Sequence, residues 1–169
     1  MGNGVLVAYA SKHGATREIA ERIAKTLTEK GFDCTSLSAE QVRDVAPYDA
    51  VVAGSAVYIG KMRKGMRSFL QKNEHVLKAK PIWLFASGPT TKGDSPGELD
   101  GWHRPASTKD LLDRLAPKDR VVFAGAVSLE KMGGLEKWMM TKVNAPLEDA
   151  REWDKIEAWA DGIATELNC

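Results

Sequence analysis

The sequence predicts an α/β fold in which helices cover both faces of a parallel β-sheet. Short apolar segments of strand length alternate with amphipathic segments of helix length, beginning with the continuous apolar run Val5–Ala10. Such a run is typical of a strand that is buried on both faces of a parallel sheet. Right-handed crossovers between such strands make neighbouring strands parallel. The sequence has no repeat, low-complexity segment or linker, so we expect one domain over residues 1–169, with an added segment at about 128–153 before the C-terminal helix.

The first part of the chain supplies two strands and the helix between them. A stripe of apolar residues at helical spacing predicts a helix over Thr16–Lys30, and Gly31 stands where a helix C-cap glycine is expected. The segment Asp33–Leu37 is typical of a second, more exposed strand. The tetrad Ser38–Gln41 matches a capping box and predicts one or two helical turns that end before Pro47.

The middle of the chain repeats the pattern of strand, loop and helix. The third strand is expected at Ala50–Gly54, and a loop of small residues, Ser55–Gly60, follows it. Helical spacing then predicts a helix over Met62–Val76. The fourth strand is expected at Pro81–Ala86, again with a small-residue loop, Ser87–Gly93, after it.

The last part of the chain completes the sheet and its cover. A capping box at Ser107–Asp110 predicts a helix over Thr108–Leu115. The fifth strand is expected at Arg120–Val127, and the final helix at Asp154–Leu167. Two stretches exceed what a minimal α/β unit needs, and these are Thr90–Ala106 and Ser128–Trp153.

Composition and charge narrow the function classes. The chain carries 24 Lys and Arg against 23 Asp and Glu, so its net charge of +1 gives no electrostatic reason to expect a nucleic-acid partner. Cys34 and Cys169 form no CxxC pair and no Cys/His metal spacing, so we expect free thiols and no metal site. The first apolar run is too short for a signal peptide or a membrane span. We expect a cytoplasmic protein, for which peripheral contact with the inner face of the membrane stays open; the sequence does not fix the oligomeric state.

Three loops of small and polar residues, Ser11–Thr16, Ser55–Gly60 and Ser87–Gly93, follow the first, third and fourth predicted strands. Parallel strands end at the same edge of a sheet, and open α/β sheets bind ligands at that edge. The first loop leads directly into a helix, whose unpaired N–H groups and dipole favour an anion. Gly14 allows the backbone to approach a ligand closely, and the hydroxyl groups of the loop add donors, which together suit a phosphate.

Other phosphate-binding motifs are absent from the sequence. No G-x-x-x-x-G-K-[ST] string occurs, and Gly2-Asn3-Gly4 precedes the first strand instead of following it. Taken alone, the first loop could equally be a plain turn from strand to helix with a favourable N-cap. The presence of three comparable loops at one edge favours ligand binding.

The first loop, Ser11-Lys12-His13-Gly14-Ala15-Thr16, resembles the flavodoxin signature [ST]-x-x-G-x-T, whose loop holds the phosphate of FMN. The loop Gly54–Gly60 resembles the one that lies against the flavin ring, and Ser87-Gly88-Pro89-Thr90 matches the third flavin loop. The resemblance covers nearly the whole chain. It is closest to the flavodoxin-like subgroup that contains the bacterial menaquinone-dependent protoporphyrinogen oxidase, through Phe123–Ala126 and Lys137–Trp153.

The resemblance implies a flavodoxin-like three-layer sandwich with a five-stranded parallel sheet in the order 2-1-3-4-5. It also implies one non-covalently bound FMN, with chemistry centred on the flavin and no protein group required as acid or base. The flavin contacts would come from the three loops: Ser11, Lys12, His13, Gly14, Ala15, Thr16, Ser55, Ala56, Val57, Tyr58, Ile59, Gly60, Ser87, Gly88, Pro89, Thr90 and Gly93.

The chain departs from the flavodoxin pattern at several points. His13 stands where flavodoxins usually have Thr, so one phosphate hydroxyl is missing. The second loop has no tryptophan, which leaves Tyr58 or Ile59 to cover the flavin ring. Unlike typical electron-shuttling flavodoxins the chain is not acidic, and the oxidase insertion is shortened within Ser128–Trp153.

Two groups of residues are candidates for contact with a substrate or partner. The basic cluster Lys61, Arg63, Lys64 and Arg67 would receive propionates, a phosphate or an acidic redox partner, and a solvated helix face is the alternative. The second group would form a hydrophobic lid for a quinone or porphyrin, or a membrane-facing helix, with ordinary packing as the alternative. Met132, Trp138 and Met139 belong to one helical stripe, and Trp102 and His103 in the long loop after the fourth strand would border the same site.

Two functions of different classes follow from the resemblance. One is an FMN oxidoreductase of protoporphyrinogen-oxidase type, which passes electrons from a reduced tetrapyrrole to a quinone. The other is a flavodoxin-type carrier that moves electrons between protein partners and has no small substrate. The basic cluster and the Met/Trp segment favour the enzyme, and the shortened insertion favours the carrier. A signalling domain that reuses the fold is the least favoured of the functions, because three loops keep flavin-type chemistry. Fold alone would not decide among these functions.

Overall fold

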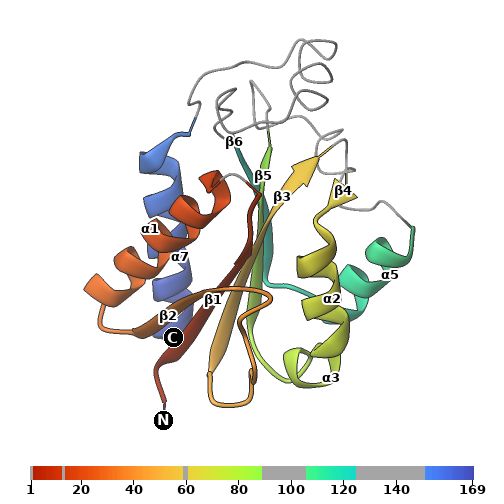
Figure 1. The fold of residues 1–169 in the computed structure, drawn as a ribbon. Coiled ribbons are helices and arrows are strands. Elements are labelled where there is room, and N and C mark those ends of the chain that lie inside the picture. The colour runs from red at the N-terminus through yellow and green to blue at the C-terminus, as the bar shows by residue number, and fades with distance from the viewer. Residues whose placement is uncertain (1, 13, 59–60, 89–105, 125–150) are drawn as a thin grey trace.

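The computed structural model describes residues 2–12, 14–58, 61–88, 106–124 and 151–169. Within them lies one twisted sheet with the strand order β2-β1-β3-β5-β6, in which these five strands are parallel and β4 pairs antiparallel with β3 (Figure 1). The order of the five parallel strands is therefore 2-1-3-4-5, as the resemblance implies. The strands are β1 Gly4–Ala10, β2 Asp33–Ser38, β3 Ala50–Tyr58, β4 Lys61–Met62, β5 Ile82–Gly88 and β6 Asp119–Ala124.

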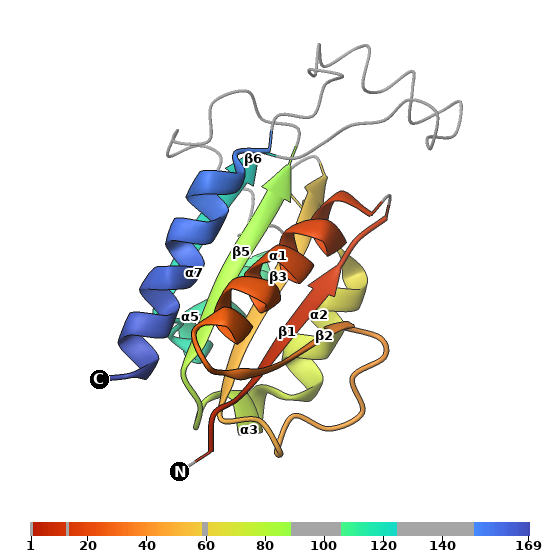
Figure 2. The same ribbon diagram turned by 90° about the vertical axis from the view of Figure 1, so that its left-hand side faces the viewer.

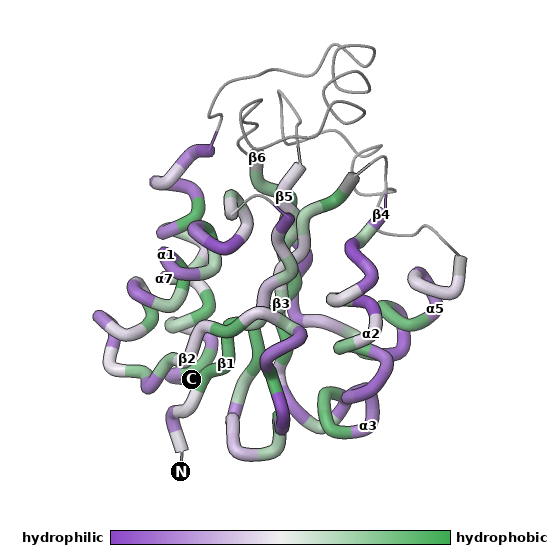
Figure 3. Tube along the Cα trace, in the orientation of Figure 1, coloured by the Kyte–Doolittle hydropathy of each residue, from purple (hydrophilic) through white to green (hydrophobic). Residues whose placement is uncertain are grey.

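Helices cover both faces of this sheet and make a three-layer sandwich. Helices α1 and α7 pack side by side on one face, and α2, α3 and α5 cover the other (Figures 1 and 2). Along the helices hydrophobic and hydrophilic residues alternate at turn spacing, so each helix has one apolar side to bury (Figure 3). The helices are α1 Ala15–Glu29, α2 Lys64–Lys72, α3 Glu74–Leu77, α5 Ala106–Leu115 and α7 Trp153–Leu167.

The core consists of two apolar clusters, one on each side of the sheet. Alternate residues of β1 face opposite sides, so Val5 and Val7 join the cluster under α1 and α7 whereas Leu6 and Ala8 join the other. Every side chain of β5 is buried, which is the pattern of a central parallel strand. None of the helices in the described part of the chain is long and apolar enough to cross a membrane.

The predicted loops after the third and fourth strands begin later than the sequence suggests. Strand β3 runs to Tyr58 and β5 to Gly88, so the residues from Ser55 to Tyr58, together with Ser87 and Gly88, lie in strands. The parallel ladder continues through the pairs Ser55–Ala86 and Ala56–Ser87. The alternation of small residues that indicated a loop is therefore a strand end, held by pairing with its neighbour.

The helix predicted over Met62–Val76 is divided. Met62 is buried at 6% exposure in β4, where it pairs with Val57, and its apolar character reflects this strand position. Helix α2 then ends at Asn73, whose side-chain amide donates to the carbonyl oxygen of Phe69 at 2.8 Å. Asn favours helix ends because its side chain competes for backbone groups, so a separate short helix, α3, follows.

Neither of the two capping boxes predicted from the sequence caps the start of a helix, and the reasons differ. The N–H of Ser38 does donate to Gln41 Oε1 at 3.3 Å, but only a turn follows, because Ala39 donates its N–H to the carbonyl oxygen of Tyr9 and prolongs the pairing with β1. Helix α5 begins at Ala106, so Ser107 lies inside the helix and is not its cap. The fifth strand is described as far as Ala124, and the rest of its predicted range lies outside the described residues.

Candidate functional site

The turn between β1 and α1 presents the start of a helix to the carboxyl edge of the sheet. Gly14 is the N-cap of α1 and has left-handed backbone angles (φ 93°), which glycine adopts without strain. Its carbonyl oxygen accepts the first helical hydrogen bond, from the N–H of Glu18 at 3.1 Å. No side chain of the described residues caps this helix, so the amides of its first turn face the edge without an intrahelical partner.

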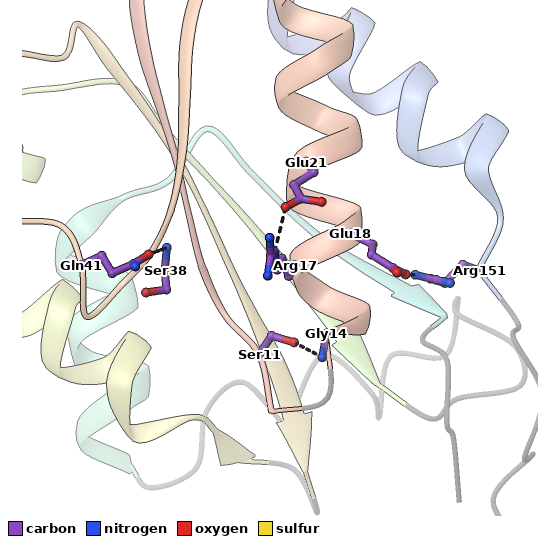
Figure 4. Close-up of polar contacts among 8 residues, drawn as sticks. All are labelled: Ser11, Gly14, Arg17, Glu18, Glu21, Ser38, Gln41 and Arg151. Carbon is purple, nitrogen blue, oxygen red and sulfur yellow. Dashed lines mark hydrogen bonds and ion pairs between the residues drawn. The ribbon is translucent and has the colours of Figure 1, made fainter. Parts of the chain in front are cut away.

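Ser11 holds the turn in place by a hydrogen bond to its backbone (Figure 4). Its Oγ accepts a hydrogen bond of 2.9 Å from the N–H of Gly14, which occupies one amide of the loop. A hydroxyl that accepts one bond still has its own proton to donate. Ser11 therefore both shapes the turn and keeps a donor for an anion, and Gly14 has open space where a side chain would stand.

Thr16 connects the first turn of α1 to the third predicted flavin loop. Its hydroxyl lies 3.1 Å from the hydroxyl of Ser87, and the exposed fractions of the two residues are only 1% and 4%. One of the two donates to the other, and the acceptor retains its proton. The structure thus brings the first and third predicted loops together through a buried hydrogen bond.

Ser55 connects the end of β3 to the start of α2. The residue is fully buried, its hydroxyl donates to the carbonyl oxygen of Ala56 at 2.9 Å, and it accepts from the N–H of Arg63 at 3.1 Å. Ala56 is half-buried, and Val57 packs partly buried against the core. The register pairs Ala10 with Ser55, so β1, β3 and β5 end next to one another as the sequence predicts.

Gly54 is a packing glycine. A Cβ at this position would lie 1.9 Å from Cζ of Phe85, far inside contact distance. Phe85 belongs to an aromatic cluster with Phe123 and Trp159, in which ring centroids are 5.6 to 6.1 Å apart. The absence of a side chain at Gly54 therefore leaves room for the ring of Phe85, which packs in this cluster.

Charges around the first turn of α1 are arranged in pairs. Glu18 lies in that turn, where its carboxylate would repel a bound anion, and Arg151 forms an ion pair with it (Figure 4). Arg17 donates from Nε to Glu21 at 2.8 Å, and this bond raises the pKa of the guanidinium group. The acid in the first turn of α1 is therefore compensated, whereas Glu40, which lines the adjoining cavity, has no ion pair among the described residues.

Two cavities adjoin the turn, both on its β2 side. One of about 490 Å³ is lined by the turn itself and the segment after β2, and the other, of about 670 Å³, lies between that segment and α2. Several residues that line these cavities are not predicted by the sequence, although an aromatic residue one position before the end of the first strand, Tyr9, is a signal for one of them. They are Tyr9, Arg17, Ser38, Glu40 and Gln41.

The basic cluster falls on β4, on the N-cap of α2 and within that helix. Arg63 and Lys64 line the larger cavity. Lys61 is exposed in β4, and Arg67 is half-buried on α2 away from the cavity lining. No group of His, Cys, Asp and Glu that could hold a metal ion occurs among the described residues.

The remaining predicted site residues cannot be placed. Tyr58 is described as backbone at the end of β3. The others lie outside the described residues, and they are His13, Ile59, Gly60, Pro89, Thr90, Gly93, Trp102, His103, Met132, Trp138 and Met139.

Comparison with known proteins identifies a family and a relative for this chain. The family model described as Flavodoxin domain matches residues 6–154. Protoporphyrinogen IX dehydrogenase (quinone) of Escherichia coli K12 is 22% identical in an alignment that covers 94% of this chain and 93% of the relative.

Solved structures share the fold at low sequence identity. A flavodoxin of Streptococcus pneumoniae TIGR4 superimposes with a TM-score of 0.61 at 16% identity, over 96% of this chain and 99% of that one. The rubredoxin oxygen:oxidoreductase of Desulfovibrio gigas gives a TM-score of 0.65 at 15% identity, over 98% of this chain but only 36% of that longer chain.

Proposed function

The chain belongs to the flavodoxin domain family, and from this premise we propose that it is an FMN-dependent oxidoreductase of protoporphyrinogen-oxidase type. In this proposal it moves electrons from a reduced substrate through FMN to a quinone or a protein acceptor. Membership of this family makes the chain a flavodoxin-type redox protein with FMN as its cofactor. The substrate and the acceptor are the proposed part.

The residues described at the edge of the sheet fit the phosphate of FMN. The uncapped first turn of α1 offers backbone N–H donors, Gly14 allows close approach, and Ser11 retains a hydroxyl proton. Lys12 lines the adjoining cavity and would add positive charge. When bound, FMN supplies the electron transfer, and this chain holds, orients and shields it.

One observation carries the proposal of a phosphate site. The amides of the first turn of α1 have no side-chain cap, although the turn sits at the ligand-binding edge and its only acid, Glu18, is paired with Arg151. Helices α2, α3 and α7 also start without a side-chain cap, and α1 differs from them in beginning at a glycine, which leaves room for an anion to approach the amides. An anion at this place would satisfy the amides and the helix dipole together.

A titration of flavin-free protein tests the site. We expect FMN to bind with quenching of its fluorescence and to bind much more tightly than riboflavin, because only FMN carries the phosphate. Equal affinity for the two flavins would remove the phosphate site from the proposal. Absence of flavin absorption and of any binding would overturn the assignment of the pocket altogether.

The oxidase reading draws support from the relative in E. coli, which spans almost the same length as this chain. The basic cluster Lys61, Arg63, Lys64 and Arg67 would meet acidic groups of the substrate. Trp102, His103, Met132, Trp138 and Met139 would supply apolar contacts to a tetrapyrrole or quinone. The alternative is a carrier between redox proteins, which the overall likeness to flavodoxins of similar length favours.

Anaerobic stopped-flow mixing separates these two functions. Oxidised FMN protein is mixed with protoporphyrinogen, and the flavin absorbance is followed with and without menaquinone. The oxidase requires bleaching of the flavin by the tetrapyrrole and its return when quinone is added. A flavin that protoporphyrinogen leaves oxidised, but that a reduced redox protein bleaches, would instead support the carrier.

A further inference from the structure

The larger cavity is a feature that the flavin site does not use. Its volume of about 670 Å³ lies within the range of small-molecule pockets, about 300 to 1,000 Å³. It is bounded by the end of β1, by the segment after β2 and by α2. Tyr9 and Ser11 line it as well as the smaller cavity, so it lies next to the phosphate turn.

Helix α2 lines this cavity along its whole length. The lining residues occur in pairs on successive turns, namely Lys64 with Gly65, Ser68 with Phe69 and Lys72 with Asn73. This spacing of four residues keeps them on one face of the helix, over a length of about 12 Å from residue 64 to 72. The cavity is therefore elongated rather than the size of a single inorganic ion.

The floor of the cavity is apolar. Ala10, Ala39 and Phe69 are buried, and the half-buried Val42 and Tyr9 lie beside them. A fully hydrated ion would leave this surface wet, whereas an apolar body would remove it from water. The lining thus favours an organic ligand.

The rim of the cavity is cationic, and its cations have no partners among the described residues. Arg63, Lys64 and Lys72 line it without any ion pair, and the whole segment 61–72 holds five Lys or Arg and no acid in a chain of net charge +1. In α1, by contrast, every cation has an acidic partner. Those pairs are Arg17–Glu21, Arg22–Glu157 and Lys25–Glu29.

The placement of these cations also runs against the dipole of α2. Arg63 and Lys64 stand at the positive end of the helix, whose first turn contains no acid. The one acid in the cavity is Glu40, whose Oε1 lies 3.1 Å from the position that a Cβ on Gly65 would occupy. Local rules of this kind are most often broken at functional sites, where a ligand supplies the missing charge.

We propose that this cavity is a second ligand site that binds a small organic anion with an apolar, ring-sized body, such as an aromatic carboxylate or sulfonate. The ring lies on the apolar floor, and the acidic group faces Arg63, Lys64 and Lys72. Glu40 opposes binding, because it is the only negative charge that lines the cavity. Of the residues that line this cavity, only Ser11 belongs to a predicted flavin loop, and Arg63 and Lys64 also belong to the basic cluster.

Heteronuclear NMR titration of the full chain with naphthalene sulfonate, in the presence of saturating FMN, tests the site. We expect chemical-shift changes at residues 38–42 and 63–73, and weaker changes with neutral naphthol or with inorganic phosphate. Shifts confined to residues 14–17 would place the probe in the phosphate turn and overturn the proposal. The same titration without FMN gives a reading that does not depend on whether FMN binds.

Charge variants inside and outside the cavity separate binding at this site from nonspecific attraction of an anion. Lys64→Gln and Lys72→Gln should each weaken binding roughly two- to fivefold, the range for one solvent-exposed charge interaction, and Glu40→Gln should strengthen it by a similar factor. The matched control is Lys118→Gln, an exposed lysine outside the cavity, which should leave the affinity unchanged. Equal effects of Lys64→Gln and Lys118→Gln, or weaker binding in Glu40→Gln, would contradict the proposal.

Discussion

The hydroxyl groups of Thr16 and Ser87 lie 3.1 Å apart in the interior, 71 positions apart in the chain. The first turn of α1 and the end of β5 are thereby joined at the edge of the sheet where we propose that the flavin binds. A buried hydroxyl without a partner costs about 1–3 kcal/mol, so this pair fixes the relative position of the two segments. One buried contact thus links two segments that the sequence predicts to line the same site.

Removal of either hydroxyl should therefore destabilise the fold, and removal of both should cost less than the sum. We expect Thr16→Val and Ser87→Ala each to lower the free energy of unfolding by about 1–3 kcal/mol. The double-mutant cycle should give a coupling of about 0.5–3 kcal/mol, measured by urea denaturation. Additive effects of the two substitutions would show that the hydroxyl groups do not interact.

Alanine substitutions at Gly54, which is crowded, and at Gly162, which is not, test the packing around Phe85. Gly54→Ala places a Cβ against the ring of Phe85, in a cluster of three aromatic side chains, and should destabilise by about 1–3 kcal/mol or more. Gly162 lies within α7 with open space around it, so Gly162→Ala should stabilise by up to about 1 kcal/mol. Thermal and urea unfolding of both variants measure the contrast, and a tolerated Gly54→Ala would mean that Phe85 moves easily.

Most of the fold could be predicted from the sequence, because its signals are local and repeated. The apolar run of β1, the helical stripe of α1 and the glycine that follows its C-cap, Gly31 (φ 97°), all follow from spacing and residue type. The wrong predictions lie where contacts with a segment distant in the sequence determine the local structure. The segment Ser38–Gln41 satisfies half of a capping box, but the hydrogen bond from Ala39 to Tyr9 holds it at the sheet edge, and no local pattern shows this.

The candidate site could be predicted in outline and not in its polar details. The turn at Ser11–Thr16 was identified from its residue types and its position after a strand. The tie between Thr16 and Ser87 and the pairing of Glu18 with Arg151 join residues more than 70 positions apart, which sequence spacing does not reveal. The unpaired cations of α2 were visible as a cluster, but the cavity beside them depends on how the segment after β2 folds back.

Substitution of Gly14 and of Gly31 distinguishes the effect of backbone strain from a loss of flavin binding. Both have positive φ, 93° and 97°, and open space where a Cβ would stand. Alanine at either position should therefore cost a similar amount of stability, about 1–2 kcal/mol. Only Gly14→Ala should also weaken FMN binding, because only Gly14 borders the phosphate turn. Titration of both variants with FMN measures this, and equal loss of affinity in Gly31→Ala would show that the effect is a general one.

The acid response of the fold should depend on Glu74. Hydrogen bonds from Arg114 and Lys78 lower the pKa of this carboxyl group from 4.5 to about 2. A lowered folded-state pKa contributes stability above the unfolded value, and that contribution is lost as the pH falls from about 4.5 to about 2. Glu74→Gln should thus be less stable than the parent protein at pH 7, with the difference shrinking towards pH 2. Glu166→Gln, at a carboxylate without an ion pair among the described residues, is the control in urea denaturation.

Arg151 should control the affinity for FMN from a position outside the flavin loops. It forms the ion pair with Glu18 in the first turn of α1, and its guanidinium lies 4.7 Å from the ring centroid of Trp153, with which Arg22 makes a similar contact at 4.6 Å. Arg151→Gln leaves the carboxylate of Glu18 uncompensated near the uncapped amides, where it repels a phosphate. We expect FMN binding to weaken several-fold, more at low than at high salt because salt screens exposed charges. Riboflavin, which has no phosphate, should bind as before.

Removal of the opposing charge completes this test. In the Glu18→Gln/Arg151→Gln double variant neither charge is present, so FMN affinity should return to within about twofold of the parent value, the range of an exposed ion pair. Fluorescence titrations of the two single variants and the double variant at two salt concentrations measure the cycle. If the double variant binds FMN as weakly as Arg151→Gln alone, then Arg151 acts through its packing on Trp153 and not through the charge of Glu18. Urea denaturation of the same variants shows separately how much the cation–π contact contributes to the junction between α1 and α7.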